Sequence, residues 1–325
     1  MQKLTVTPST PAAIAHVESP AVDLTGMHIV VFGGVGTLAS AFLLSASRAG
    51  ARITVADLFP GSADDAAAGI AAALAQWNAT ADFYRVDVTD IDDCVAFCEE
   101  VADERAIDVA IDFAGIHHPP MDLVLDQPSE LVSKFRRVID VNLTGAFNVT
   151  VAAARVMVPR RSGQIIHLCS NGSRASLYGS YGYNASKHGA EGVVKTAAAQ
   201  LAPFGVRVNA VAPGTVITDL NRSLSFDESG APRPRAKSIL AHTPTKRFAT
   251  AEGVAETIVS MCVPQRHFTG NVVFCDDGYN VEGHSWPDGN AALYGGPDAV
   301  DALYASLDER YPRVGSPGPD GATDA

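Results

Sequence analysis

Basic residues are scarce in this sequence. Its 325 residues include 24 Lys and Arg against 36 Asp and Glu, which gives a formal net charge of −12. Nucleic acids and anionic membranes are bound through basic faces, so this balance argues against either as the main partner. We therefore expect a small-molecule substrate as the partner, with neither a nucleic acid nor a membrane.

Long apolar runs and frequent cysteines are also missing. No apolar run reaches the roughly 18 residues of a membrane span, and residues 1–25 lack a basic start followed by an apolar block. The five cysteines are odd in number and scattered, as is typical of a reducing compartment. Cys94 and Cys98 have no second ligand pair nearby. We expect a cytoplasmic protein with buried thiols and no metal site.

The chain is 47% hydrophobic, and apolar strand-like runs alternate with Ala-rich helical stretches. The predicted strands cover residues 27–32, 52–57, 82–88, 107–115, 163–170, 206–213 and 271–278. Strands that alternate with helices in this way predict crossover units and a parallel sheet. We predict one α/β domain over residues 26–280, a Rossmann-like doubly wound sheet of about seven parallel strands with helices on both faces.

Three segments fall outside this pattern. Residues 1–25 form an N-terminal extension, and residues 281–325 form a C-terminal extension with one helix candidate at 297–311 and an end that we expect to be disordered. Residues 219–247 are interrupted by proline and polar, with Asn221, Arg222, Arg233, Arg235 and Lys237 among them. Because they follow a strand end, we expect a mobile substrate lid there.

A tyrosine and a lysine carry the clearest chemical signal. Tyr183 and Lys187 are four residues apart in a predicted helix, so both lie on one face. A free tyrosine has a pKa near 10, but a neighbouring ammonium group favours the phenolate form. Such a tyrosine can exchange a proton with a substrate hydroxyl. Ser170 closes the strand 163–170, at the edge where parallel sheets bind their ligands.

Together with these residues, Asn142 in "VNLTGAF" and the segment "VNAVAPGTVITD" make the chain resemble the short-chain dehydrogenase/reductase family over about residues 25–280. The resemblance implies that Tyr183 is the general acid/base. Lys187 would support it and bind the nicotinamide ribose, and Ser170 would orient the substrate oxygen. Asn142 would hold a helix bend and a water that relays protons.

The cofactor is predicted from charge and from the same resemblance. Asp57 ends the second strand, where a carboxylate accepts hydrogen bonds from the ribose hydroxyls and repels a 2′-phosphate. No Arg or Lys follows it in "DLFPGSADD", so we predict NAD. The predicted cofactor-binding residues are Gly33, Gly36, Thr37, Leu38, Asp57, Leu58, Asp87, Val88, Ala114, Gly115, Tyr183, Lys187, Pro213, Gly214, Val216 and Thr218.

The sequence departs from the family pattern at the glycine loop "VFGGVGTLAS". Thr37 and Ala39 stand where the family has its second and third glycines. Threonine is the harder replacement, because the backbone there approaches the pyrophosphate and a positive φ suits glycine. Gly36, one residue earlier, could carry the turn instead. Asp112 and Phe113 replace the two asparagines of the family's Asn-Asn-Ala-Gly.

The substrate is less well defined by the sequence. His117, Asn171, Ser173 and Trp286 are the candidate contacts, and a sugar acid, polyol or similar hydroxylated molecule is the leading hypothesis. A hydrophobic ring alcohol or ketone, such as a steroid or terpenoid, is the main alternative. A non-catalytic NAD-sensing or scaffold protein, and a dehydratase or epimerase that retains NAD, are the rivals from other classes. The resemblance also implies a homotetramer or homodimer built through helices such as 142–158 and 183–202.

Overall fold

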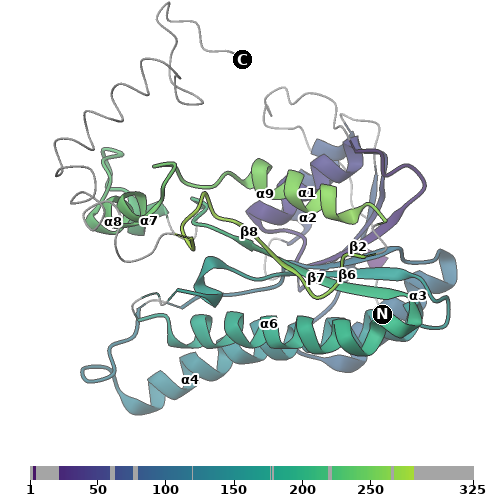
Figure 1. Cartoon of the computed structure of the whole chain (residues 1–325), viewed down its shortest axis with the longest axis horizontal. Coiled ribbons are helices and arrows are strands. Elements are labelled where there is room, and N and C mark those ends of the chain that lie inside the picture. The colour runs from purple at the N-terminus through teal and green to yellow at the C-terminus, as the bar shows by residue number, and fades with distance from the viewer. Residues whose placement is uncertain are drawn as a thin grey trace, which may run out of the picture.

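The computed structural model describes residues 3–4, 22–58, 63–75, 80–118, 120–175, 177, 179–218, 222–264 and 267–281 (Figure 1). The predicted helix at 297–311 and the candidate substrate contact Trp286 lie outside these residues.

A single sheet runs through the centre of the fold. Its order is β1-β4-β3-β2-β5-β6-β7-β8. The seven strands from β2 onward are parallel, which confirms the predicted doubly wound sheet. They are β2 (His28–Phe32), β3 (Arg52–Asp57), β4 (Ala81–Arg85), β5 (Val109–Asp112), β6 (Gly163–Leu168), β7 (Val206–Pro213) and β8 (Val272–Cys275). The short strand β1 (Lys3–Leu4) was not predicted and pairs antiparallel with β4.

Helices cover both faces of the sheet (Figure 1). One layer holds α1 (Thr37–Arg48), α2 (Ala63–Ala75) and α9 (Ala251–Cys262), and the other holds α3 (Ile91–Glu104), α4 (Pro128–Ile139), α5 (Gly145–Met157) and α6 (Tyr181–Leu201). Helix α4 was not predicted, and it continues into α5 through a π-helical turn over Asp140–Thr144. The predicted lid contains two short helices, α7 (Arg222–Ser225) and α8 (Pro234–His242).

Alternating side chains of each strand enter different halves of the core. On β2, Ile29 and Val31 pack with the residues of α1 and α9, whereas Val30 and Phe32 pack with those of α3, α5 and α6. All four are fully buried. Burial on both faces explains the continuous apolar strands, and each such side chain contributes about 1.5–3 kcal/mol. The resulting platform fixes where the strands end.

Several parallel strands end earlier than the sequence predicts. β4 ends at Arg85, β5 at Asp112 and β6 at Leu168. The predicted site residues Asp87, Ala114 and Ser170 therefore lie in the loops that follow the carboxyl ends of these strands. This edge of a doubly wound sheet is the one that binds ligands.

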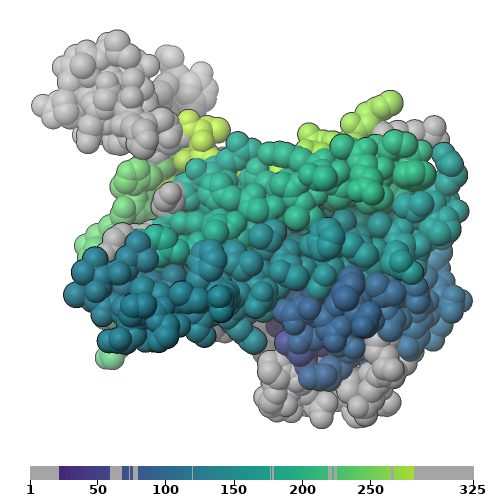
Figure 2. All heavy atoms as spheres, turned by 90° about the horizontal axis from the view of Figure 1, so that it is seen from below, coloured from purple at the N-terminus to yellow at the C-terminus, as the bar shows by residue number. Residues whose placement is uncertain are grey.

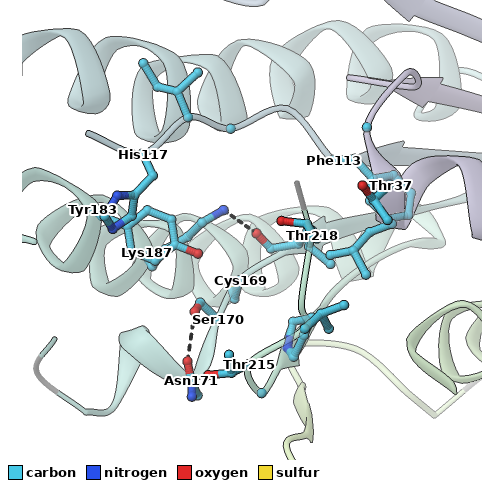
Figure 3. A pocket seen from close by; sticks show the side chains of 18 of the residues that line it. Thr37, Phe113, His117, Cys169, Ser170, Asn171, Tyr183, Lys187, Thr215 and Thr218 are labelled. Carbon is cyan, nitrogen blue, oxygen red and sulfur yellow. Dashed lines mark hydrogen bonds between the residues drawn. The ribbon is translucent and has the colours of Figure 1, made fainter. Parts of the chain in front are cut away.

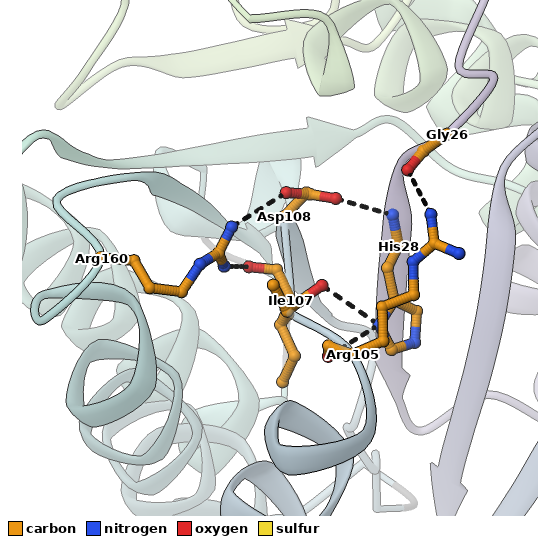
Figure 4. A network of polar contacts seen from close by, with 7 residues as sticks. Gly26, His28, Arg105, Ile107, Asp108 and Arg160 are labelled. Carbon is orange, nitrogen blue, oxygen red and sulfur yellow. Dashed lines mark hydrogen bonds and ion pairs between the residues drawn. The ribbon is translucent and has the colours of Figure 1, made fainter.

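The opposite, amino-terminal edge is closed by polar contacts (Figure 4). The Asp108 carboxylate accepts hydrogen bonds from the His28 backbone N–H at 2.9 Å and from the Arg160 guanidinium at 3.4 Å. Arg160 also donates to the Ile107 carbonyl at 2.7 Å, and Arg105 donates to the Gly26 carbonyl at 2.6 Å. These contacts join the starts of β2 and β5 to the end of α5.

In the part of the chain that the structure describes, no helix is long and apolar enough to span a bilayer. Among the same residues, no three His, Cys, Asp or Glu side chains cluster as metal ligands would. The five cysteines are free thiols, four of them buried. Burial raises the pKa of the Cys94 thiol to about 12, so it stays protonated at neutral pH.

Candidate active site

A cavity of about 380 Å³ opens at the carboxyl edge of the sheet, between the glycine loop and the start of α8 (Figure 3). It brings together most of the residues predicted for the site. Those that line it are Gly33, Gly36, Thr37, Leu38, Gly115, His117, Ser170, Asn171, Tyr183, Lys187, Pro213, Gly214, Val216 and Thr218.

Other predicted residues do not line this cavity. Asp57, Leu58, Asp87, Val88, Ala114, Asn142 and Ser173 are not among the lining residues. Asp87 accepts hydrogen bonds from the N–H and hydroxyl of Thr89, and thus closes a turn after β4. Val88 is buried against Gly145 of α5. These two residues shape the wall from outside the described cavity.

The glycine loop turns at Gly33, contrary to the expectation that Gly36 carries the turn. Gly33 has φ +71°, and a Cβ there would lie 2.5 Å from the Ala114 backbone nitrogen. Gly36 has φ −77° and precedes α1, and a Cβ at this position would have no described atom within 4 Å. Thr37 is the first residue of α1 and needs no positive φ. The threonine is therefore accommodated without backbone strain.

The start of α1 has the features of a phosphate site. No side chain caps this helix, and no acidic residue lies in its first turn. The first N–H groups of a helix lack intrahelical acceptors and favour anions such as a pyrophosphate. Asp57 shapes the loop, because its carboxylate accepts hydrogen bonds from the Val35 N–H at 3.1 Å and the Leu58 N–H at 2.7 Å. The open space beside Gly36 leaves room for a dinucleotide, so these residues fit the predicted cofactor.

Asp112, which departs from the family pattern, supports the same loop from below. One carboxylate oxygen accepts a hydrogen bond from the Ala114 N–H at 3.0 Å, and the other lies 3.1 Å from Nδ1 of His167. His167 Nε2 lies 2.9 Å from the Thr150 hydroxyl, and all three side chains are buried. Both ring nitrogens of His167 therefore have a polar partner. Asp112 thus links β5 to β6 and α5 while it holds the backbone that packs on Gly33.

Tyr183 and Lys187 lie one turn apart on α6 and both face the cavity (Figure 3). The Lys187 ammonium lies 5.8 Å from the centre of the Tyr183 ring. It donates a hydrogen bond to the Leu168 carbonyl at 2.6 Å, and the side chain is buried. Burial of its alkyl stem and this one backbone bond fix the ammonium beside the phenol.

Ser170 is held by the short 3₁₀ helix Asn171–Ser173 that follows β6. Its hydroxyl accepts a hydrogen bond from the Gly172 N–H at 3.0 Å and donates to Oδ1 of Asn171 at 3.2 Å. The Ser173 hydroxyl lies 2.6 Å from both the Ser170 carbonyl and the carboxylate of Glu191. Ser173 is therefore turned toward the protein, which argues against its predicted contact with substrate.

Glu191 anchors this segment from α6. Its buried carboxylate accepts hydrogen bonds from Ser173, from Arg174 at 3.3 Å and from Lys195 at 3.2 Å. Burial alone would raise the pKa of Glu191, but the hydrogen bonds from Ser173, Lys195 and Arg174 outweigh it and leave that pKa lowered. An ionised Glu191 therefore tethers the turn that carries Ser170.

Asn142 lies in the π-helical turn between α4 and α5. Its amide oxygen accepts a hydrogen bond from the Ile116 N–H at 2.8 Å, and its amide nitrogen donates to the Ile116 carbonyl at 2.9 Å. A second donation reaches the Ser186 hydroxyl at 3.2 Å. π-Bulges of this kind interrupt regular helices at functional sites. Asn142 thereby joins the bent helix to the loop after β5.

His117 lies over Tyr183, with ring centres 4.9 Å apart. Its Nε2 is 3.1 Å from the Ser180 hydroxyl. Burial lowers the pKa of His117, and repulsion from His118 and from Arg235 of the lid lowers it further. The imidazole is therefore neutral at physiological pH and forms one wall of the cavity beside the reacting tyrosine.

Similarity to known proteins agrees with this geometry. A family model described as enoyl-(acyl carrier protein) reductase matches residues 36–280. The chain belongs to the short-chain dehydrogenase/reductase family. Its similar members are named as dehydrogenases and reductases, so the chain is an oxidoreductase, and solved structures share the doubly wound sheet described above.

Characterised family members match nearly over their full length. The chain is 33% identical over 255 residues to cis-4-hydroxycyclohexanecarboxylate dehydrogenase of Sinomonas cyclohexanicum, covering 78% of this chain and 96% of the relative. It is 29% identical over 260 residues to the mitochondrial borneol dehydrogenase of Lavandula x intermedia, covering 79% and 92%. A solved structure assigned as an NAD(P)-dependent gluconate 5-dehydrogenase of Beutenbergia cavernae, with NADP bound at low occupancy, has TM-score 0.70 and 27% identity, covering 80% and 99%.

Some residues of the family site emerge only from the structure. Phe113, Ile116, Cys169, Leu177, Thr215 and Arg235 also line the cavity. Phe113, Ile116, Cys169 and Thr215 are directly adjacent to predicted residues, so adjacency was the signal available for them, whereas Leu177 adjoins none. Arg235 lies 52 residues after Tyr183, in a lid with several other cations, and no sequence pattern separates it from them.

Proposed function

We propose that this short-chain dehydrogenase/reductase oxidises a secondary alcohol of a small hydroxylated molecule, with NAD as the hydride acceptor. A sugar acid or polyol is the leading substrate class. The observation that carries the proposal is that Ser170, Tyr183 and Lys187 line one cavity with the loop Gly33–Thr37. A substrate hydroxyl bound in this cavity would lie between the proton acceptor, Tyr183, and the cofactor site at the glycine loop.

In the proposed mechanism, Tyr183 removes the proton of the substrate hydroxyl as general base. The nicotinamide, when bound, would accept a hydride from the carbon that carries this hydroxyl. Ser170, whose hydroxyl is held by Gly172 and Asn171, orients the substrate oxygen. Positive charge develops at the carbinol carbon as the hydride leaves and the oxygen loses its proton. Tyr183 and Ser170 would both contact this oxygen, and their alignment lowers the barrier.

Lys187 and Asn142 complete the proton path in this proposal. The Lys187 ammonium stabilises the phenolate of Tyr183 and is positioned to bind the ribose of the cofactor. Asn142 holds the loop after β5 beside Lys187, since a Cβ on Gly115 would lie 3.5 Å from the Asn142 oxygen and 3.7 Å from the Lys187 ammonium. Both side chains therefore lie against the same glycine, and in this proposal a water bound near them would carry protons to solvent.

The choice of NAD rests on Asp57. Its carboxylate ends β3 and is fixed by Val35 and Leu58 beside the start of α1. A 2′-phosphate at this position would meet a negative charge, whereas ribose hydroxyls can donate to it. Because the gluconate 5-dehydrogenase structure contains NADP, the affinities of this protein for NAD and for NADP must be compared directly.

We also propose that the chain forms a homodimer or homotetramer through the face that carries α4, α5 and α6 (Figure 2). Large apolar side chains are exposed there: Val132, Phe135, Phe147 and Tyr181 are between 38% and 54% exposed. Apolar side chains grouped on one face favour association with a second copy.

The test combines calorimetry with turnover. We expect NAD to bind more tightly than NADP, and NADH to be released when secondary alcohols and sugar acids are screened. Tyr183→Phe should bind NAD normally but lower kcat by at least ~100-fold, the lower range for loss of a general acid/base. Tyr181→Phe is the matched control, because Tyr181 lies on the same helix but is exposed and outside the cavity lining.

Three outcomes would contradict the proposal. Equal turnover in Tyr183→Phe would exclude the tyrosine mechanism. Failure to bind either nucleotide would favour a scaffold role. Conversion of substrate without release of NADH would favour a dehydratase or epimerase that retains its cofactor.

A further inference from the structure

The charges around the cavity differ from those of the whole chain. The protein carries a formal net charge of −12. Within the described cavity lining there are two cations, Lys187 and Arg235, and no Asp or Glu. A concave site with cations and low-dielectric walls raises the local concentration of anions. The cavity is therefore suited to an anionic ligand despite the acidic surface around it.

Lys187 has a role in the proposed chemistry, but Arg235 has none. Arg235 lies at the start of α8, and among the described residues it makes no ion pair or hydrogen bond. Arginine presents several donors in a planar fork that matches a carboxylate in a bidentate manner. A partly buried guanidinium that faces a cavity without a protein carboxylate is available to a ligand.

The lid segment that carries Arg235 is anchored. The neighbouring Ala236 is fully buried. Arg233 joins the start of α8 to the preceding segment, since its N–H donates to the Ser225 carbonyl at 2.9 Å and its Nε donates to the Phe226 carbonyl at 3.0 Å. These contacts position Arg235 at the mouth of the cavity, rather than leaving it to move with a long surface loop.

Arg235, His117 and Tyr183 line the same cavity. The charge of Arg235 acts on His117, and the His117 ring lies against Tyr183, with ring centres 4.9 Å apart. Because His117 is neutral, Arg235 is the cation of the described lining besides the catalytic lysine. A small molecule whose hydroxyl reaches Tyr183 and Ser170 can direct a second polar group past His117 toward Arg235.

We infer that Arg235 binds the carboxylate of a hydroxy-acid substrate and thereby selects acids over neutral alcohols. This inference rests on the proposed function, because it places the hydroxyl of the same molecule at Tyr183. Apolar residues of the same lining, including Ile116 and Leu177, would contact the carbon frame between the two groups. The substrate class is thus a small carboxylic acid that also carries a secondary hydroxyl.

The principal alternative is that Arg235 binds a phosphate of the cofactor. The two assignments differ in what they predict for nucleotide affinity. A phosphate contact requires that loss of Arg235 weaken NAD binding, whereas a substrate contact leaves NAD binding unchanged. The experiment must therefore measure cofactor and acid separately.

The experiment compares the full-length wild type with Arg235→Gln and Arg235→Lys. Turnover is measured with cis-4-hydroxycyclohexanecarboxylate and with its carboxamide, which has the same frame without the charge. In Arg235→Gln we expect kcat/KM for the acid to fall roughly 10- to 100-fold, as for a charge-assisted hydrogen bond, and kcat/KM for the amide to change less than about threefold. Arg235→Lys should retain part of the preference. Lys237→Gln, an exposed cation two residues along the same helix, should match the wild type.

A binding measurement separates this inference from the proposed function. Cyclohexanecarboxylate has no hydroxyl and cannot react, so calorimetry with the NAD-loaded enzyme tests the carboxylate site alone. Binding that weakens at least ~10-fold in Arg235→Gln supports the site even if no alcohol is oxidised, in which case the proposed reaction fails and the site stands. Weaker NAD binding in Arg235→Gln, an unchanged preference for the acid, or absence of binding to the wild type would overturn the inference.

Discussion

The two edges of the sheet use charged residues in opposite ways. At the amino edge, Asp108, Arg160 and Arg105 are paired with one another or with backbone groups (Figure 4). At the carboxyl edge, Lys187 and Arg235 face a cavity whose described lining contains no carboxylate (Figure 3). The same strand, β5, has Asp108 just before its start and Asp112 at its end.

This difference separates stabilising charges from functional ones. A charge whose partners all belong to the protein contributes to stability, and its loss should leave the chemistry intact. A cation that faces a cavity without a protein carboxylate can take its counter-charge from a ligand, so its loss should change binding more than stability. Lys187 donates to the Leu168 carbonyl, but the described lining holds no carboxylate for it or for Arg235. The site is thus distinguished by cations without a carboxylate partner as well as by its motif.

The largest expected effect comes from the glycine that packs on the loop after β5. Gly33→Ala adds a Cβ 2.5 Å from the Ala114 nitrogen at φ +71°, so we expect the free energy of unfolding to fall by roughly 3–5 kcal/mol. Gly36→Ala is the matched variant and should cost less than about 1 kcal/mol. It should still weaken NAD binding on the order of tenfold, because its methyl group enters the cavity. Chemical denaturation and calorimetry measure the two effects. Equal stability of the two variants would contradict the assignment of the turn to Gly33.

Asp108, just before β5, and Asp112, at its end, directly test the comparison between the two edges of the sheet. Asp112→Ala removes the partner of buried His167 and of the Ala114 N–H, so we expect a loss of about 2–4 kcal/mol and weaker NAD binding. Asp112→Asn should cost less than about 1 kcal/mol, because the amide can accept from Ala114 and donate to His167. Asp108→Ala should lower stability by about 1–2 kcal/mol with kcat unchanged. A loss of kcat in Asp108→Ala would show that the edges are not functionally separate.

The smallest effect concerns the residue that holds the Ser170 segment. Glu191→Gln should lower kcat about tenfold and leave NAD affinity unchanged, because it loosens the turn at Ser170 without touching the cofactor loop. Lys195→Gln removes an exposed partner of the same carboxylate and should leave kcat within about twofold.

The pH dependence of stability checks the same residue. Because the pKa of Glu191 is lowered in the folded state, its contribution is complete above its unfolded pKa and is lost as the pH falls through the folded value. Unfolding measured across acidic pH should therefore show a shallower decline for Glu191→Gln than for the wild type. Identical pH profiles of Glu191→Gln and the wild type would indicate that the Glu191 carboxylate is not ionised in the folded state.

The sequence predicted the sheet because its pattern is local. Continuous apolar runs such as Ile29–Phe32 of β2 mark strands covered on both faces, and the spacing of Tyr183 and Lys187 marks one helix face. Helix α4 was missed because its buried side is narrow: Val138 is its buried residue, and the π-turn merges it with α5. The hydrogen bond of Ser173 to Glu191 could not be predicted for a different reason, since Glu191 lies 18 residues away in the sequence.

By itself, the sequence determined the fold class and the family, because both are recognised from the periodicity of apolar residues and from particular residue types at fixed spacings. It also supplied the residue types that the proposed chemistry uses, with Tyr183 and Lys187 on one helix. The tertiary structure alone decided which glycine carries the turn, since that depends on how closely the loop after β5 approaches Gly33. It likewise distinguished Arg235 from the other cations of the lid, because facing the cavity is a property of packing between segments far apart in the sequence.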